Sequence, residues 1–305
     1  MADARAPLLN DGVLPRFPGV RCVWEGPALL GEGPVWCPDD GILYFVDIKA
    51  PAILWLNPDG SAGRMVVSSA VGAIALRRGG GLVAALRDGL AMVDTADVAP
   101  RIFCSPEEGL RRNRFNDGKC DHAGRFWLAS MDDQETNPTG SVWRLDPDLR
   151  ATRMFGGFVI GNGFGWSPDH KTMYFTDSTI RTIFAFDFDL GAGKIGRRRV
   201  FATVPESQGY PDGLCIDADG YVWSAHWDGW CITRYRPDGS MDRVVPMPVP
   251  RPTSLAFGKK ALDRLFVTSA RHGLPAEALE RAPLSGGLFE LDVGATGMKV
   301  EKFVG

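Results

Sequence analysis

Six short hydrophobic runs recur along the chain at a nearly constant interval, and this repeat constrains the fold more than any other feature. The runs are rich in β-branched and aromatic residues, and successive runs begin about 39 to 49 residues apart. They are residues 43–46, 82–85, 126–129, 173–176, 222–225 and 265–268. This spacing matches the four-stranded blades of a propeller, whereas a β-sandwich does not account for six units of nearly equal length. The sequence therefore predicts an all-β fold, a six-bladed β-propeller.

The segments between these runs indicate strands joined by short turns. Most runs follow a turn that contains Asp or Gly, and in several units a further strand comes after the run and ends in a polar turn. Asp and Gly tolerate the tight backbone of hairpins, and helical periodicity is nearly absent outside the short stretch 275–281. We expect one propeller domain over residues 21–305, preceded by an N-terminal extension, residues 1–20. We also expect residues 21–24 to join the last blade.

Composition and charge exclude several classes of partner. Hydrophobic residues make up 45% of the 305 residues, charged residues make up 23%, and the formal net charge is -3. This charge predicts no nucleic-acid or membrane partner. The first twenty residues lack the features of a secretory signal, and the six cysteines form no C-x-x-C pair. We therefore expect a cytoplasmic protein with reduced thiols, and a monomer, because closed propellers leave few exposed strand edges.

A polar residue recurs at one position of the repeat. The mouth of the central channel is expected ten or eleven residues before each run, because this interval fits one strand plus a hairpin turn. The residues at these positions are Glu32, Gly72, Asn116, Asn162, Asp212 and Ser254. Glu32, Asn162 and Asp212 are directly followed by glycine, whereas in the third unit Asp117 precedes the glycine. Either Asn116 or Asp117 is therefore expected to face the channel.

Equivalent positions of a closed ring converge on one axis, so these oxygen-bearing side chains are expected to meet. Acidic or amide residues before glycine also cap ordinary turns, but turn chemistry alone does not explain four of them at one repeat position. The four histidines form no H-x-x-H pattern, so a metal ion would be held mainly by oxygen. Carboxylates and amides suit calcium, magnesium or manganese, and zinc and iron(II) stay open. The sequence thus predicts one divalent metal ion in the channel.

Four segments in chain order resemble the signature blocks of the SMP-30/gluconolactonase/LRE-like family: residues 30–36, 114–119, 161–169 and 210–214. The resemblance runs from about residue 23 to the C-terminus, and the closing segments 266–271 and 283–289 look like those of bacterial sugar lactonases. It implies a hydrolase that opens a xylono-, arabinono- or glucono-lactone to the aldonic acid. It also implies metal binding by Glu32, Asn162 and Asp212, and substrate contacts by Arg114 and Asn116.

Three further residues are candidate substrate contacts. One family member contacts substrate through a glutamate that follows the third-blade strand, and here Gln134 or a neighbouring Asp takes its place. The loops between the second and third strands of each blade are expected on the mouth side, and they carry Lys49 and His226. Both residue types also serve as exposed or structural loop residues, so these alternatives stay open.

The residue set suits hydrolysis of a cyclic ester. A divalent cation polarises a carbonyl and activates water, Arg114 stabilises the developing oxyanion, and Asp212 is the candidate general base. No G-x-S-x-G segment indicates a serine esterase. Two alternatives remain: another metal-dependent hydrolase, such as an esterase or phosphotriesterase-like enzyme, and a non-catalytic calcium-binding regulatory propeller. More apolar loops would favour the first, and Arg114 argues against the second because a storage site needs no substrate arginine.

Overall fold

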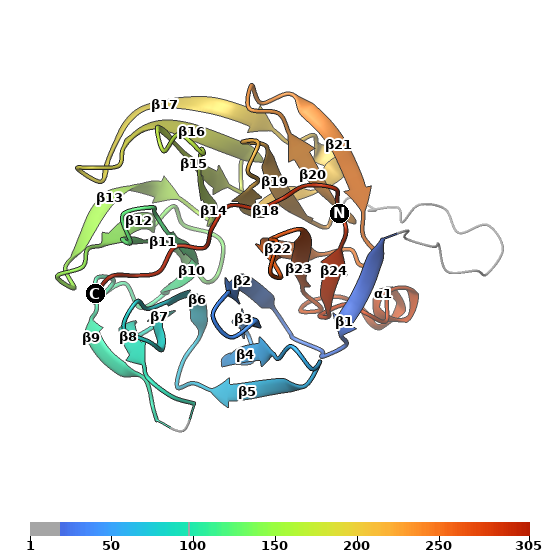
Figure 1. Ribbon diagram of the computed structural model, residues 1–305, viewed down its shortest axis with the longest axis horizontal. Helices are drawn as coiled ribbons and strands as arrows, with labels where there is room; N and C mark the ends of the chain where they lie inside the picture. Colours follow the sequence, from blue (N-terminus) through green and yellow to red (C-terminus); the bar gives the residue numbers. More distant parts are fainter. Residues whose placement is uncertain (1–18, 97) are drawn as a thin grey trace.

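Six four-stranded antiparallel sheets are arranged as blades around a common axis, so the predicted six-bladed β-propeller is confirmed (Figure 1). The computed structural model describes residues 19–96 and 98–305. The first three blades consist of β2 (Gly31–Cys37), β3 (Ile42–Asp47), β4 (Ala52–Leu56), β5 (Ala62–Val66); β6 (Val71–Leu76), β7 (Leu82–Leu86), β8 (Gly89–Val93), β9 (Arg101–Cys104); and β10 (Asn113–Cys120), β11 (Phe126–Asp132), β12 (Gly140–Leu145), β13 (Ala151–Phe158).

The remaining blades follow the same order from the axis outward. They consist of β14 (Gly161–Trp166), β15 (Thr172–Asp177), β16 (Thr182–Asp189), β17 (Lys194–Thr203); β18 (Tyr210–Ile216), β19 (Val222–Trp227), β20 (Cys231–Tyr235), β21 (Met241–Pro246); and β22 (Pro252–Gly258), β23 (Arg264–Ser269), β24 (Leu288–Leu291), β1 (Val20–Trp24). The six hydrophobic runs lie in the second strand of each blade. Two short helices, η1 (Glu206–Gln208) and α1 (Ala276–Arg281), interrupt the strands of the described ranges.

The ring is closed by the N-terminal strand. β1 pairs antiparallel with β24, with Val20 opposite Leu291, so the first and last parts of the described chain share one blade. The prediction that residues 21–24 join the last blade is confirmed. The predicted N-terminal extension, residues 1–20, lies outside the described residues except for its last two, and its boundary stays a prediction.

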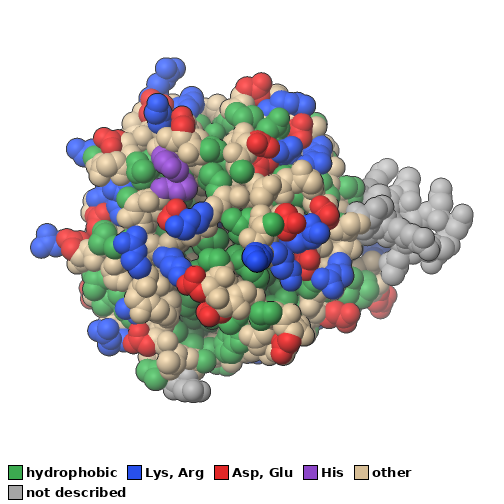
Figure 2. All heavy atoms as spheres, in the orientation of Figure 1, with side chains coloured by type: hydrophobic (Ala, Val, Ile, Leu, Met, Phe, Trp, Pro, Cys, Tyr) green, Lys and Arg blue, Asp and Glu red, His purple; other side chains and the backbone are tan. Residues whose placement is uncertain are grey.

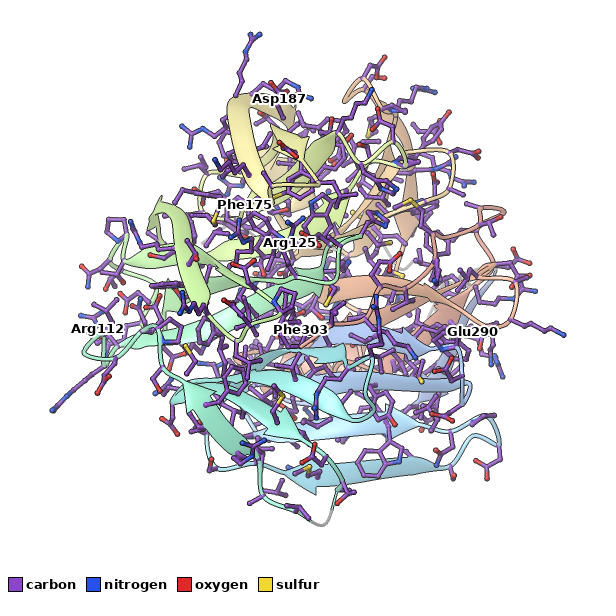
Figure 3. All side chains as sticks on the ribbon, turned by 60° about the vertical axis from the view of Figure 1, so that its left-hand side comes forward. Arg112, Arg125, Phe175, Asp187, Glu290 and Phe303 are labelled. Atoms are coloured by element: carbon purple, nitrogen blue, oxygen red, sulfur yellow. The ribbon has the colours of Figure 1, made fainter. Side chains whose placement is uncertain are left out.

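The C-terminal segment crosses the face at which the inner strands end. In Figure 1 this dark red segment passes over β18 and β14 toward the C-terminus. The N–H of Phe303 donates to the Leu76 carbonyl (2.8 Å) and that of Val304 to the Gly124 carbonyl (3.1 Å). Phe303 is fully buried and lies among the strands in Figure 3. The segment therefore links blades two and three across the end of the channel opposite the mouth.

Charged side chains of both signs lie on the face that Figure 2 draws. Figure 2 shows basic and acidic side chains interspersed over the face that the C-terminal segment crosses. No helix of the described ranges is both long and apolar enough to cross a membrane.

Every innermost strand has an irregular register near its start. The pairing shifts around Glu32, Gly72, Asn116, Gly163, Asp212 and Ser254, one position in each blade. Such β-bulges bend a strand and re-aim a side chain. Gly33 and Gly163 have φ of +51°, which a side chain would disfavour. The recurring polar-glycine pairs therefore belong to bulged strands and not to turns, and in four of the six blades the residue at the bulge lines the cavity at the mouth with a polar side chain.

Candidate functional site

A cavity of about 380 Å³ opens at the mouth, where the inner strands begin. It is lined by Leu30, Glu32, Arg114, Asn116, Met131, Glu135, Ile160, Asn162, Ser178, Thr179, Tyr210, Asp212 and Trp227. Four of the polar residues predicted from the repeat, one from each of four blades, are thus brought to one cavity. Arg114 is at the same place because it precedes Asn116 by two residues on β10.

Hydrogen bonds fix the amide side chains of the cavity. Arg114 Nη1 donates to Asn116 Oδ1 (2.6 Å), and Asn116 Nδ2 donates to Asn162 Oδ1 (2.8 Å). Asn162 Nδ2 donates to Ser178 Oγ (2.9 Å), whose hydroxyl donates to the Pro211 carbonyl (2.7 Å). This chain of bonds orients both amides. Because an amide oxygen has two lone pairs, Asn162 Oδ1 can accept one further interaction from the cavity.

Two of the three acidic residues that line the mouth cavity, Glu32 and Asp212, are buried and lack a basic partner within the described residues. Glu32 is 4% exposed and Asp212 is 6% exposed. Glu32 accepts only the N–H of Gly33 (2.9 Å), and neither carboxylate forms an ion pair within residues 19–96 and 98–305. Burial, followed by the negative charges of Asp212 and Asp117, raises the pKa of Glu32 well above its usual value. Burial and the charge of Asp117 likewise raise the pKa of Asp212.

The arrangement fits a divalent cation. Uncompensated buried carboxylates are costly, and a cation between them removes both the repulsion and the desolvation penalty. Glu32 and Asp212 offer carboxylate oxygens, and Asn162 offers the free lone pair of its amide oxygen. The described part of the chain has no cluster of three or more His, Cys, Asp or Glu side chains arranged for a metal. The predicted set differs from such a cluster because an amide supplies its third ligand.

Asp117 faces a different part of the channel. Its two carboxylate oxygens accept the N–H groups of Gly118 (2.6 Å) and Gly163 (2.8 Å). It lines a second cavity of about 120 Å³, farther along the channel, and not the mouth cavity. Both residues thus face the channel, and Asn116 is the one that lines the mouth cavity.

Three predicted substrate contacts do not line the mouth cavity. The ammonium of Lys49 donates to Asp133 Oδ1 (2.9 Å), and Gln134 lies exposed in the loop after β11. His226 is fully buried, its Nδ1 lies 3.1 Å from the Gln208 carbonyl, and burial lowers its pKa to about 4. Substrate binding by Lys49, Gln134 and His226 stays a prediction that the lining of the cavity does not support.

Glu135 is the acidic residue that the sequence reasoning missed. It lines the cavity, one position after Gln134, and its φ of +56° is unusual for a residue with a side chain. The preceding Asp132 holds the loop by accepting hydrogen bonds from Arg112 Nη2 (2.8 Å) and from the N–H of Asn137 (2.8 Å). The sequence analysis placed Gln134 or a neighbouring Asp at this contact, whereas the residue of this loop that lines the cavity is Glu135. The acidic residue directly after Gln134 was the available signal.

The chain belongs to the SMP-30/gluconolactonase/LRE-like family, whose model matches residues 30–271. Regucalcin of Oryctolagus cuniculus is 35% identical over 295 residues, covering 94% of this chain and 98% of the relative. Human (Homo sapiens) regucalcin is 34% identical with the same coverage. The protein is thus a propeller of the class that contains gluconolactonases and regucalcins.

Solved structures agree with this membership. The calcium-binding protein regucalcin from Agrobacterium tumefaciens has a TM-score of 0.90 at 29% identity, covering 94% of this chain and 97% of that one. A luciferin-regenerating enzyme has a TM-score of 0.85 at 30% identity, covering 93% and 99%. A gluconolactonase from Xanthomonas campestris has a TM-score of 0.74 at 24% identity, covering 90% and 89%, and shows the shared fold.

Proposed function

We propose that this protein is a metal-dependent lactonase that opens sugar-acid lactones, such as xylono-, arabinono- or glucono-lactone, to the aldonic acid. Glu32, Asn162 and Asp212 hold one divalent metal ion. The observation that carries the proposal is the pair of buried carboxylates without a basic partner, on the same cavity as a buried arginine. The gluconolactonases of the family support the choice of reaction.

The bound ion supplies Lewis-acid polarisation of the lactone carbonyl and lowers the pKa of a water molecule. Arg114 donates from Nη2 to the oxygen on which negative charge develops, and Asn116 keeps the guanidinium in place. Asp212 accepts the proton of the attacking water through the carboxylate oxygen turned to the cavity. Glu135, Ser178 and Thr179 offer acceptors and donors to sugar hydroxyls, and the ring packs on Trp227.

The donor set leaves the identity of the ion to experiment. Oxygen ligands favour calcium, magnesium or manganese, and zinc and iron(II) are the other candidates. The Agrobacterium tumefaciens regucalcin is described as a calcium-binding protein, which supports calcium among the ions to be tested. We further propose that the protein acts in the cytoplasm, as a monomer, on a small molecule.

A second candidate is a metal-dependent esterase that acts on lactones or esters with an apolar substituent. The observation that favours it is the apolar part of the cavity wall, formed by Leu30, Met131 and Ile160. An aliphatic or aromatic substituent gains free energy by packing against such side chains, whereas a sugar hydroxyl does not.

The test is a panel of lactones and metal ions. Metal-stripped protein, reloaded with each ion in turn, is expected to acidify at least one of the three sugar lactones faster than the spontaneous rate. Aryl and aliphatic lactones form the arm that supports the second candidate. Absence of hydrolysis across all lactones and ions, together with tight calcium binding, would replace both with a calcium-binding propeller.

A matched pair of variants tests the metal ligands. Glu32→Gln is expected to weaken metal binding at least about 10-fold in calorimetry, because one anionic ligand is lost. Ser254 occupies the equivalent position of the sixth blade and does not line the mouth cavity. Ser254→Ala is therefore expected to keep the wild-type affinity. Equal affinities of the wild type and Glu32→Gln would remove Glu32 from the site.

A further inference from the structure

Three cationic side chains from three blades converge on the carboxylate of Asp133. Lys49 lies between β3 and β4, Arg87 lies between β7 and β8, and Arg114 lies on β10. Asp133 Oδ1 accepts hydrogen bonds from Lys49 Nζ (2.9 Å) and Arg114 Nε (2.7 Å), and Oδ2 accepts one from Arg87 Nη2. One carboxylate at the edge of the mouth thus connects blades one, two and three.

Residues of its own blade also fix the position of Asp133. Its N–H donates to the Arg112 carbonyl (2.9 Å), and the neighbouring Asp132 is buried and accepts the Arg112 guanidinium and several groups of the loop. Burial alone would raise the pKa of Asp133, but hydrogen bonds from Lys49 and Arg114 lower it to about 2. The carboxylate is therefore fully charged at neutral pH and is fixed in position.

The bond to Asp133 determines the direction of the Arg114 guanidinium. Arg114 is 3% exposed, its Nε is bonded to Asp133, and its Nη1 donates to Asn116 Oδ1 and to the Phe115 carbonyl (3.1 Å). Because the guanidinium is planar, two such anchors set the direction of the third nitrogen. Nη2 donates to no residue of the described ranges, and Arg114 lines the mouth cavity. Nη2 is therefore the nitrogen left for a ligand.

We propose that Asp133 is a positioning residue that aims Arg114 Nη2 at the reacting carbonyl, and that Lys49 and Arg87 hold Asp133 in place and do not touch the substrate. This inference rests on the proposed lactonase function for its kinetic consequence, but the geometry itself does not. Without the Asp133 charge, Arg114 Nε loses its anionic acceptor and three cations lie together without an anion. The guanidinium then samples orientations that do not reach the carbonyl.

The first experiment measures the geometry without activity. The Arg114 guanidinium signals in ¹⁵N NMR spectra are assigned by their loss in Arg114→Lys. In the wild type we expect separate Nη signals, because the anchored group rotates slowly about its Cζ–Nε bond. In Asp133→Asn we expect one averaged signal. Separate signals that persist in Asp133→Asn would overturn the proposal, whatever reaction the protein catalyses.

The second experiment measures the kinetic consequence on the metal-loaded protein. Asp133→Asn is expected to lower kcat about 10- to 100-fold while metal affinity changes less than about twofold. In an Arg114→Ala background the same substitution is expected to have no further effect, because Asp133 acts through Arg114. Additive losses in this double-mutant cycle would show a role independent of Arg114 and overturn the proposal. Absence of lactone hydrolysis by the wild type would overturn the proposed function and leave the NMR test intact.

The chain offers a matched control. Asp242 also faces three arginines, Arg234 (3.4 Å), Arg236 (3.0 Å) and Arg243 (3.9 Å), but on the outer strand β21 and away from the mouth. Asp242→Asn is expected to keep the wild-type kcat and KM.

Lys49→Met is expected to lower kcat about two- to fivefold, with KM within about twofold of the wild-type value. A large increase of KM in Lys49→Met with an unchanged kcat would instead identify Lys49 as a substrate contact and remove it from the proposal.

Discussion

Buried carboxylates occur at both ends of the inner strands, and they differ in what they contact. At the end opposite the mouth, Asp217 is 1% exposed and accepts hydrogen bonds from Trp223 Nε1 (2.9 Å) and Arg234 Nη2 (2.6 Å). At the mouth, Glu32 and Asp212 are almost as deeply buried but, among the residues that the structure describes, accept only backbone N–H groups. Asp217 is thus matched by a cation within the described chain, whereas Glu32 and Asp212 at the mouth are not.

The difference separates a structural role from a functional one. The pattern at Asp217 recurs two blades earlier, where Asp121 accepts Trp127 Nε1 (2.8 Å) and Arg125 Nε (2.7 Å). A carboxylate matched in this way stabilises the fold, and removing one partner is costly. Unmatched buried carboxylates destabilise the chain on its own, and such strain is typical of sites that bind a ligand.

The largest expected effect is the loss of catalytic activity when an unmatched carboxylate of the mouth is replaced. Asp212→Asn is expected to reduce kcat/KM at least about 1,000-fold, or about 4 kcal/mol, because it removes both a metal ligand and the proton acceptor. Its melting temperature in the absence of metal should be no lower than that of the wild type. Steady-state kinetics with saturating metal and a thermal melt with chelator measure the two effects. Full activity of the variant would contradict the functional assignment of this end.

At the end opposite the mouth, an Asp-to-Asn substitution is expected to lower the stability of the fold and to leave the activity unchanged. Asp217→Asn removes the closer of the two anions that Arg234 contacts, leaving Asp242 at 3.4 Å, and should lower the free energy of unfolding by about 3 kcal/mol. The folded fraction should retain the wild-type kcat/KM, since Asp217 lies at the other end of β18. Chemical denaturation and kinetics below the melting temperature provide the measurements. A variant as stable as the wild type would mean that the Asp-Trp-Arg contacts are not structural.

Local patterns explain why so much of the fold was predictable. The period of the hydrophobic runs, the turn residues between them and the apolar segment near residue 21 all act over a few residues. They sufficed for six blades and for ring closure. The convergence of Glu32, Asn162 and Asp212 on one cavity then follows from ring symmetry, which places equivalent positions around one axis.

Details that depend on loop length and on contacts between blades were not predictable in the same way. The conformation of the loop after β11 brings Glu135, and not Gln134, to the cavity. The contact between Lys49 and Asp133 joins loops of the first and third blades, so the sequence repeat does not predict it. The sequence analysis weighed turn capping by the polar residues before glycine and favoured a shared site, but it did not predict the β-bulges that re-aim these side chains within the strands.

His226 lies at the mouth end of its blade, but it is fully buried, as are the residues that stabilise the opposite end. Its folded pKa of about 4 lies below the usual 6.5, so as pH falls from 6.5 to 4 the unfolded chain binds a proton that the folded chain does not. The free energy of unfolding should therefore fall by up to about 3 kcal/mol over this interval. His226→Gln should lose this dependence, as measured by denaturation between pH 7 and pH 5. Equal slopes for the two proteins would mean that His226 is accessible to protons and thus to substrate.

The smallest expected effect tests the unmatched charge itself. Glu32→Gln removes a carboxylate whose pKa is raised by burial and by neighbouring negative charges, so metal-free protein should gain roughly 1 kcal/mol, or about 2 °C in melting temperature. The sign follows from linkage: with a raised folded pKa, ionisation destabilises the fold as pH rises above the usual value of the carboxyl. The gain should therefore be larger at pH 8 than at pH 5, and it should reverse when metal is added, since only the wild type then binds the ion tightly. Thermal melts with chelator and with metal at both pH values measure this. A metal-free variant less stable than the wild type at pH 8 would show that Glu32 is matched within the chain, and the contrast between the two ends would not hold.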